Sequence, residues 1–139
     1  MIHVIMGLKG SGKTKKLIDS IHDTVAASQG DVVCIEYGKN LTYDVSYKVR
    51  LVDSQEYGIR STEMLKGFLS GLHAGNFDIT HVFLDNLYKL VKKPMDAPST
   101  YCDELIEWIA KFAETNNVEV TFTISEDPAN ASEVLKKYI

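Results

Sequence analysis

The sequence alternates between short segments rich in β-branched residues and longer segments with a helical spacing of apolar residues. This alternation limits the folds open to the chain more than any other feature. Residues 2–6, 32–37 and 79–84 are mostly apolar runs that end at Gly, Asp or Asn. Such runs predict strands that are buried on both faces, and the helical segments between them predict crossover connections. We therefore predict an α/β fold, a three-layer sandwich with a mainly parallel central sheet of about five strands.

The remaining elements follow from the same two periodicities. We predict further strands at 47–53 and 118–124, and helices at 13–28, after the cap Ser61, from Ser99 or Thr100, and from Asp127-Pro128. In the second helix Gly67 and Gly71 lie one turn apart, which lowers helix propensity and predicts close packing against another element. Residues 86–98 form a connector between a strand and a helix.

Composition places the chain among ordinary globular domains. The 139 residues suit one domain, 1–139, with 45% apolar and 24% charged residues. A formal charge of -4 gives no overall positive field, so a nucleic-acid partner is not indicated. No apolar window is long enough for a membrane span, and the first residues lack the pattern of a signal peptide. Cys34 and Cys102 belong to no CxxC pair and have no histidine cluster nearby. We therefore expect both to be buried free thiols, and we expect a cytoplasmic location.

Residues 7–14, Gly-Leu-Lys-Gly-Ser-Gly-Lys-Thr, form a complete G-x-x-x-x-G-K-[ST] motif between the first predicted strand and the first predicted helix. Gly7, Gly10 and Gly12 permit backbone conformations that turn N–H groups inward toward a phosphate chain. Ser11 belongs to the same phosphate-binding loop. The spacing predicts that Lys13 reaches the β- and γ-phosphates and that the Thr14 hydroxyl ligates Mg²⁺.

This motif resembles the Walker A motif of the P-loop NTPase superfamily residue for residue. Residues 81–85, His-Val-Phe-Leu-Asp, resemble a Walker B strand. The resemblance implies that Asp85 holds Mg²⁺ through water. The competing interpretation is that Asp85-Asn86 is an ordinary turn at the end of a strand.

The order of elements resembles the RecA-like and additional-strand ATPases and the thymidine-kinase-like enzymes, in which another strand lies between the Walker A and Walker B strands. Residues 118–124 are the candidate for that strand. The resemblance implies that Thr123 or Ser125 lies near the γ-phosphate as a polar sensor. The alternative is that both residues face solvent or cap the following turn.

The residue that activates water is less clearly marked. Additional-strand ATPases often carry a glutamate directly after the Walker B aspartate, and this chain has Asn86 there. Some RecA-like proteins place the glutamate at the end of the strand after the first helix, which matches Glu36. Glu36 is thus the candidate base, and the alternative is a strand-end acid paired with a surface lysine.

Three functions follow from these residues. The first is an ATP-binding, Mg²⁺-dependent ATPase in which Glu36 or Asn86 positions water and hydrolysis is slow without a partner. The second is a small-molecule or nucleoside kinase similar to thymidine kinases, although the zinc-binding cysteines and an arginine-bearing lid are missing. The third is an ATP-sensing module that changes a protein interface without turnover. ATP is favoured over GTP because the chain lacks the guanine-reading N-K-x-D motif.

Two surface features bear on partners. Arg60 could reach the γ-phosphate of a neighbouring subunit if the chain forms a homo-oligomer or binds a protein partner. Residues 87–94 carry three lysines among apolar residues and could contact a partner, nucleic acid or substrate. We expect a solvated loop there, because no arginine accompanies the lysines.

Overall fold

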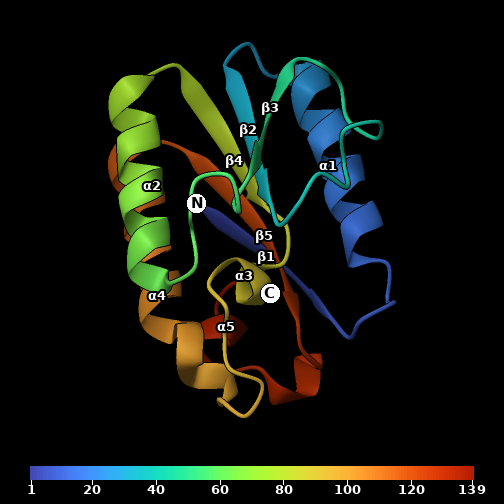
Figure 1. Ribbon diagram of the computed structural model, residues 1–139, viewed down its shortest axis with the longest axis vertical. Helices are drawn as coiled ribbons and strands as arrows, with labels where there is room; N and C mark the ends of the chain where they lie inside the picture. The colour runs from blue at the N-terminus through green and yellow to red at the C-terminus, as the bar shows by residue number, and fades with distance from the viewer.

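The computed structural model describes all residues from 1 to 139 and contains one five-stranded sheet. All neighbouring strands are parallel, in the order β1-β5-β4-β2-β3 (Figure 1). The strands are β1 (Ile2–Gly7), β2 (Asp31–Glu36), β3 (Val49–Asp53), β4 (Ile79–Leu84) and β5 (Glu119–Ser125). The predicted α/β fold with a parallel sheet of five strands is confirmed.

Helices cover both faces of the sheet (Figure 1). Helix α1 (Lys13–Ala27) lies on one face, and α2 (Thr62–Gly75) and α4 (Asp103–Asn116) lie on the other. Alternate residues of β2 enter the two cores, because side chains of a strand alternate between its faces. Val32 and Cys34 pack in the cluster that contains α1 residues, whereas Val33 and Ile35 pack in the cluster that contains residues of α2 and α4.

Strand β5 lies between β1 and β4, as predicted for residues 118–124. In the register of the sheet, Gly7 is opposite Ser125, and Leu84 is opposite Phe122. The carboxyl ends of β1, β5 and β4 therefore meet at one edge, which points toward the bottom of Figure 1. In open α/β sheets this edge is where ligands bind.

Three predicted segments differ from the structure in detail. The connector 86–98 contains a short helix, α3 (Leu87–Leu90), which is capped by the side chain of Asn86. The helix predicted from Ser99 or Thr100 begins as a 3-10 turn over Ser99–Cys102, and neither hydroxyl caps α4. The predicted last helix is a 3-10 turn (Pro128–Asn130) followed by α5 (Glu133–Lys136). The division arises because Asp127 and Ser132 each cap a separate short helix.

The prediction of close packing at Gly67 and Gly71 is wrong. A Cβ atom at either position would meet no atom within 4 Å, because both glycines lie on the exposed face of α2. The prediction for the cysteines is confirmed, since Cys34 and Cys102 are buried and free. No helix has the length and apolar character needed to cross a bilayer.

Candidate functional site

The loop between β1 and α1 has a backbone that favours glycine at two positions. Gly10 has φ +83° and Gly12 has φ +89°, both in the left-handed region that L side chains rarely adopt. Gly12 is also the residue that precedes the first turn of α1. These glycines let the chain turn from the end of β1 directly into the helix.

Gly7 and Ser11 fit together inside the same loop. A Cβ atom at Gly7 would lie 2.4 Å from the Ser11 Oγ, so the serine side chain occupies the space that a larger residue would need. The Ser11 N–H also donates to the Leu8 carbonyl across 3.0 Å. Both residues shape the loop, and neither lines the pocket described below.

The amino end of α1 carries the partial positive charge of the helix dipole, and no acidic side chain of the first turn neutralises it. No side chain caps this helix, and its first turn contains no acidic residue. Its first amide groups and the helix dipole are therefore available to an anion. Lys13 donates from Nζ to the Leu8 carbonyl across 2.9 Å, which holds the ammonium against the loop. Burial lowers the pKa of Lys13, and the opposing charge of Asp85 acts to raise it.

Asp85 is held at the end of β4 by neighbours on both sides. Its N–H donates to the Ile35 carbonyl of β2 across 2.9 Å. Thr123 of β5 donates from Oγ1 to the Asp85 Oδ1 across 3.0 Å and accepts the Asn86 N–H across 2.6 Å. Thr123 thus fixes the carboxylate through one oxygen and leaves the Asp85 Oδ2 free to act as a ligand.

These elements enclose a pocket of about 410 Å³ at the carboxyl ends of β1, β5 and β4, and no hydrophobic residue lines it. We call it the loop pocket. Its lining residues are Lys9, Gly10, Gly12, Lys13, Thr14, Lys15, Asp85, Asn86, Thr123 and Ser125. The structure therefore brings most of the predicted site residues into one pocket and leaves out Gly7, Ser11 and Glu36.

The site prediction did not include Lys9 or Lys15, which also line the loop pocket. Lys9 occupies a variable position of the motif, and Lys15 directly follows it. Their closeness to the motif is the sequence signal that could have identified them. With Lys13 they make three lysines in a lining that contains one carboxylate, Asp85, although the Lys15 ammonium also pairs with Asp19 across 3.4 Å. This excess of positive charge suits a polyanionic ligand.

Glu36 lies at the end of β2, outside the loop pocket, and is 2% exposed. Its carboxylate accepts the N–H groups of Asn40 and Leu41 across 2.9 and 3.2 Å. Burial raises the pKa of Glu36, the two amide bonds lower it, and the nearby charge of Asp85 raises it further. In this arrangement Glu36 anchors the loop that follows β2, and its role as a base stays a prediction.

The donor set of the loop pocket fits a phosphate chain with Mg²⁺. Phosphate oxygens match the free amides of α1 and the Lys13 ammonium. The Thr14 hydroxyl and the Asp85 carboxylate are oxygen ligands of the kind that Mg²⁺ prefers. The chain has no group of three or more His, Cys, Asp or Glu side chains that could hold a metal ion. Such a Mg²⁺ would take its other ligands from water and phosphate.

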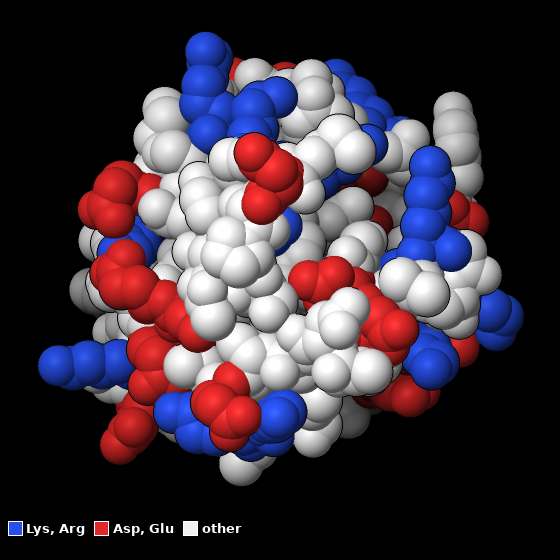
Figure 2. All heavy atoms as spheres, turned by 90° about the horizontal axis from the view of Figure 1, so that it is seen from below, with Lys and Arg blue, Asp and Glu red and all other residues white.

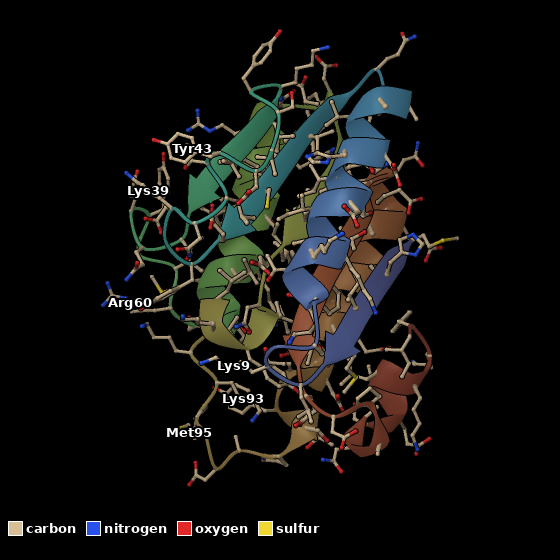
Figure 3. All side chains as sticks on the ribbon, turned by 90° about the vertical axis from the view of Figure 1, so that its right-hand side faces the viewer. Lys9, Lys39, Tyr43, Arg60, Lys93 and Met95 are labelled. Atoms are coloured by element: carbon tan, nitrogen blue, oxygen red, sulfur yellow. The ribbon has the colours of Figure 1, made fainter.

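The surface around this edge is mixed in charge. Figure 2 views the molecule from below Figure 1, and basic groups at its upper left and right are separated by acidic ones. Figure 3 shows Lys9 on the loop at the lower end of the molecule, whereas Arg60 projects outward on the left. Arg60 does not line the loop pocket, so a role for it would need a second molecule.

The chain matches no protein-family model and no curated protein. Its function is therefore inferred from the chemistry of the loop pocket.

Proposed function

We propose that the chain is an ATP-binding protein of the P-loop NTPase type with Mg²⁺-dependent ATPase activity. The observation that carries the proposal is the loop pocket, where Lys13 and Thr14 meet Asp85, which Thr123 holds in place. The position of β5 between β1 and β4 also supports it, because that order resembles the RecA-like and additional-strand ATPases.

Triphosphate binding would rest on the loop and on the start of α1. The free N–H groups at the uncapped start of α1 and the helix dipole would stabilise negative charge, and Lys13 would neutralise the β- and γ-phosphates. Lys9 and Lys15 add positive charge at the rim of the loop pocket. We propose ATP over GTP because the N-K-x-D motif that reads guanine is missing from the sequence.

Thr14 and Asp85 would hold Mg²⁺, with Asp85 acting through a water molecule. The ion would neutralise charge on the β- and γ-phosphates during transfer. The bond from Thr123 keeps the Asp85 carboxylate in one orientation, so little reorganisation is needed when the ion binds.

Turnover by the isolated chain is expected to be slow. Asn86, Thr123 and Ser125 are polar groups that would orient a water, but Asp85 is the one carboxylate that lines the loop pocket. Glu36 would act as the base only after releasing the amides of Asn40 and Leu41. A partner protein or a second copy of the chain would therefore accelerate hydrolysis.

A small-molecule or nucleoside kinase is the second candidate. A neighbouring pocket shares Asn86 and Ser125 with the loop pocket, which would set a second ligand beside the terminal phosphate. ATP would then be stable alone and would be consumed only when an acceptor is added.

The first test is the melting temperature with and without Mg·ATP. A ligand present at 100 times its Kd stabilises the folded state by about 2.7 kcal/mol, which raises Tm by several degrees. We expect that rise in the wild type and its loss in Lys13→Ala. Lys16→Ala is the matched control, since Lys16 is exposed on the same helix and does not line the loop pocket.

The result separates the candidates. Absence of a shift in the wild type at millimolar ATP, or an unchanged shift in Lys13→Ala, would contradict the proposal. Where the shift depends on Lys13, phosphate release measured with Mg·ATP alone distinguishes an ATPase from a kinase that lacks its acceptor or from an ATP sensor.

We also propose a cytoplasmic location, because neither cysteine forms a disulfide. Cys34 and Cys102 are buried free thiols, which is typical of proteins in a reducing compartment.

A further inference from the structure

A second pocket adjoins the loop pocket on the side of β2. It has a volume of about 420 Å³ and shares Asn86 and Ser125 with the loop pocket. Its other lining residues are Tyr37, Tyr88, Lys89, Lys92 and Lys93, and we call it the lysine–tyrosine pocket. Tyr37 directly follows β2, and the other four come from α3 and the residues just after it.

The lysine–tyrosine pocket offers positive charge that the protein does not neutralise. No carboxylate lines it, and none of its three lysines forms an ion pair. By contrast, Lys39 pairs with Glu56, and Lys66 pairs with two glutamates. Lysines elsewhere, such as Lys48 and Lys111, are also unpaired, so the distinguishing feature here is that three unpaired lysines line one pocket without a carboxylate among them. They favour an anionic ligand.

The ammonium groups are also held in place. Lys89 and Lys92 lie 4.8 and 5.1 Å from the centre of the Tyr37 ring, and Lys93 lies 4.9 Å from that of Tyr88. Lys93 donates as well to the Ala97 carbonyl across 2.7 Å. The aromatic faces attract the cations without removing their charge. Lys89 and Lys92 therefore remain available to a ligand, whereas Lys93 also donates to the Pro94 carbonyl across 3.3 Å.

The backbone supports the same arrangement. Lys92 has φ +54°, a left-handed conformation that is uncommon for a residue other than glycine. Asn86, at the other end of the segment, has φ +65°. The segment from 86 to 92 thus has a defined path that returns Lys92 to Tyr37, which differs from the solvated loop expected from the sequence.

We propose that the lysine–tyrosine pocket binds the phosphate group of a second, small phosphorylated ligand beside the loop pocket. Its volume of about 420 Å³ lies in the range of about 300–1,000 Å³ that is typical of small-molecule sites, which makes AMP a suitable probe. A nucleic-acid strand is disfavoured, because only three lysines and no arginine line the hollow. The inference goes beyond the proposed function and does not require that the loop pocket hydrolyses ATP.

The test measures binding of AMP and of adenosine by calorimetry, with a non-hydrolysable Mg·ATP analogue present at saturation. We expect AMP to bind the wild type and adenosine to bind at least about tenfold more weakly, because the phosphate supplies the charge-assisted contacts. Lys89→Gln/Lys92→Gln should weaken AMP by about tenfold or more. Lys48→Gln/Lys111→Gln, which removes the same charge from exposed lysines outside both pockets, should leave AMP binding unchanged.

Separate titrations distinguish this site from the loop pocket. The analogue is first titrated alone, and failure of that titration counts against the proposed function only. In Lys13→Ala, without the analogue, AMP binding that still depends on Lys89 and Lys92 assigns the phosphate to the lysine–tyrosine pocket.

Three results would overturn the inference. The first is no heat of binding at millimolar AMP, and the second is equal AMP affinity in the two double variants. The third is a single-stranded oligonucleotide of about ten nucleotides that binds at least about tenfold tighter than AMP and needs Lys89 and Lys92. That result would assign the lysines to a nucleic-acid backbone.

Discussion

Thr123 joins the ends of two strands by donating from Oγ1 to the Asp85 Oδ1 across 3.0 Å while accepting the Asn86 N–H across 2.6 Å. One hydroxyl of β5 thereby orients the carboxylate after β4 and satisfies the backbone of the following turn. Thr123 is 1% exposed, so water cannot replace either bond without rearrangement.

We expect Thr123→Val to destabilise the fold and to weaken Mg·ATP binding. The substitution keeps the shape of the side chain but leaves the Asn86 N–H without its acceptor, at a cost of about 1–3 kcal/mol. Urea unfolding measures the stability, and the Mg·ATP-dependent shift in Tm measures binding. Thr121→Val is the control, since Thr121 is also buried on β5 but does not contact Asp85. If the two variants changed the stability and the Tm shift equally, the hydrogen bonds of Thr123 would have no particular role in holding Asp85.

Asp85→Asn should reduce the contribution of Mg²⁺ to ATP binding, because the Thr14 hydroxyl remains as a ligand but the carboxylate charge is lost. In the wild type we expect ATP to raise Tm more with Mg²⁺ than with EDTA, because the Asp85 carboxylate attracts the ion. In Asp85→Asn the difference between the two rises should be smaller. Asp96→Asn, which changes an exposed carboxylate on the connector, should behave as the wild type does. A Mg²⁺ dependence as large in Asp85→Asn as in the wild type would show that Asp85 does not help to hold the ion.

The stability of the protein should contain a pH-dependent contribution from Glu36. Burial raises its pKa above the ordinary value of 4.5, so the folded state binds more protons than the unfolded state in the window between the two values. The free energy of unfolding, taken relative to Glu36→Gln, should therefore fall as pH rises through that window and then level off.

Urea unfolding from about pH 4 to pH 8 checks the Glu36 prediction. Glu114→Gln serves as the exposed control on α4 and should run parallel to the wild type. A relative stability of the wild type that increases with pH would mean that the two amide bonds outweigh burial.

Gly12→Ala should strain the loop before α1. Gly12 has φ +89°, and an L side chain in the left-handed region costs about 1–2 kcal/mol. We expect lower stability in urea and a smaller Tm shift with Mg·ATP, since the backbone N–H groups lose their orientation. Unchanged stability and binding would show that the loop tolerates another path.

Gly67→Ala should have the opposite effect on stability. Gly67 lies inside α2 on its exposed face, and a Cβ atom there would meet nothing within 4 Å. Alanine restricts the unfolded chain and favours the helix, so we expect a gain of roughly 0.5–1 kcal/mol in urea unfolding. A loss of stability would imply a contact at this surface that the structure does not contain.

The glycine-containing loop between β1 and α1 and the α/β class could be predicted because their signals are local. Residues 7–14 are consecutive, and the period of apolar residues distinguishes strands from helices within short windows. The place of residues 118–124 between the first and fourth strands was predicted from the resemblance alone, and the rest of the strand order was not predicted, since periodicity does not say which strands are neighbours. The last helix was mispredicted as one element because Asp127 and Ser132, five residues apart, each cap a separate short helix.

The sequence by itself determined the glycine loop, the strands and the main helices, because backbone preference and side-chain periodicity act between residues near in the chain. Only the tertiary structure decided that Thr123 donates a hydrogen bond to Asp85 and that a loop amide donates to Glu36. It also decided that Lys89 and Lys92 lie over the Tyr37 ring. Those contacts join segments brought together when the two faces of the sheet are buried, and the resulting distances are not encoded in any local pattern.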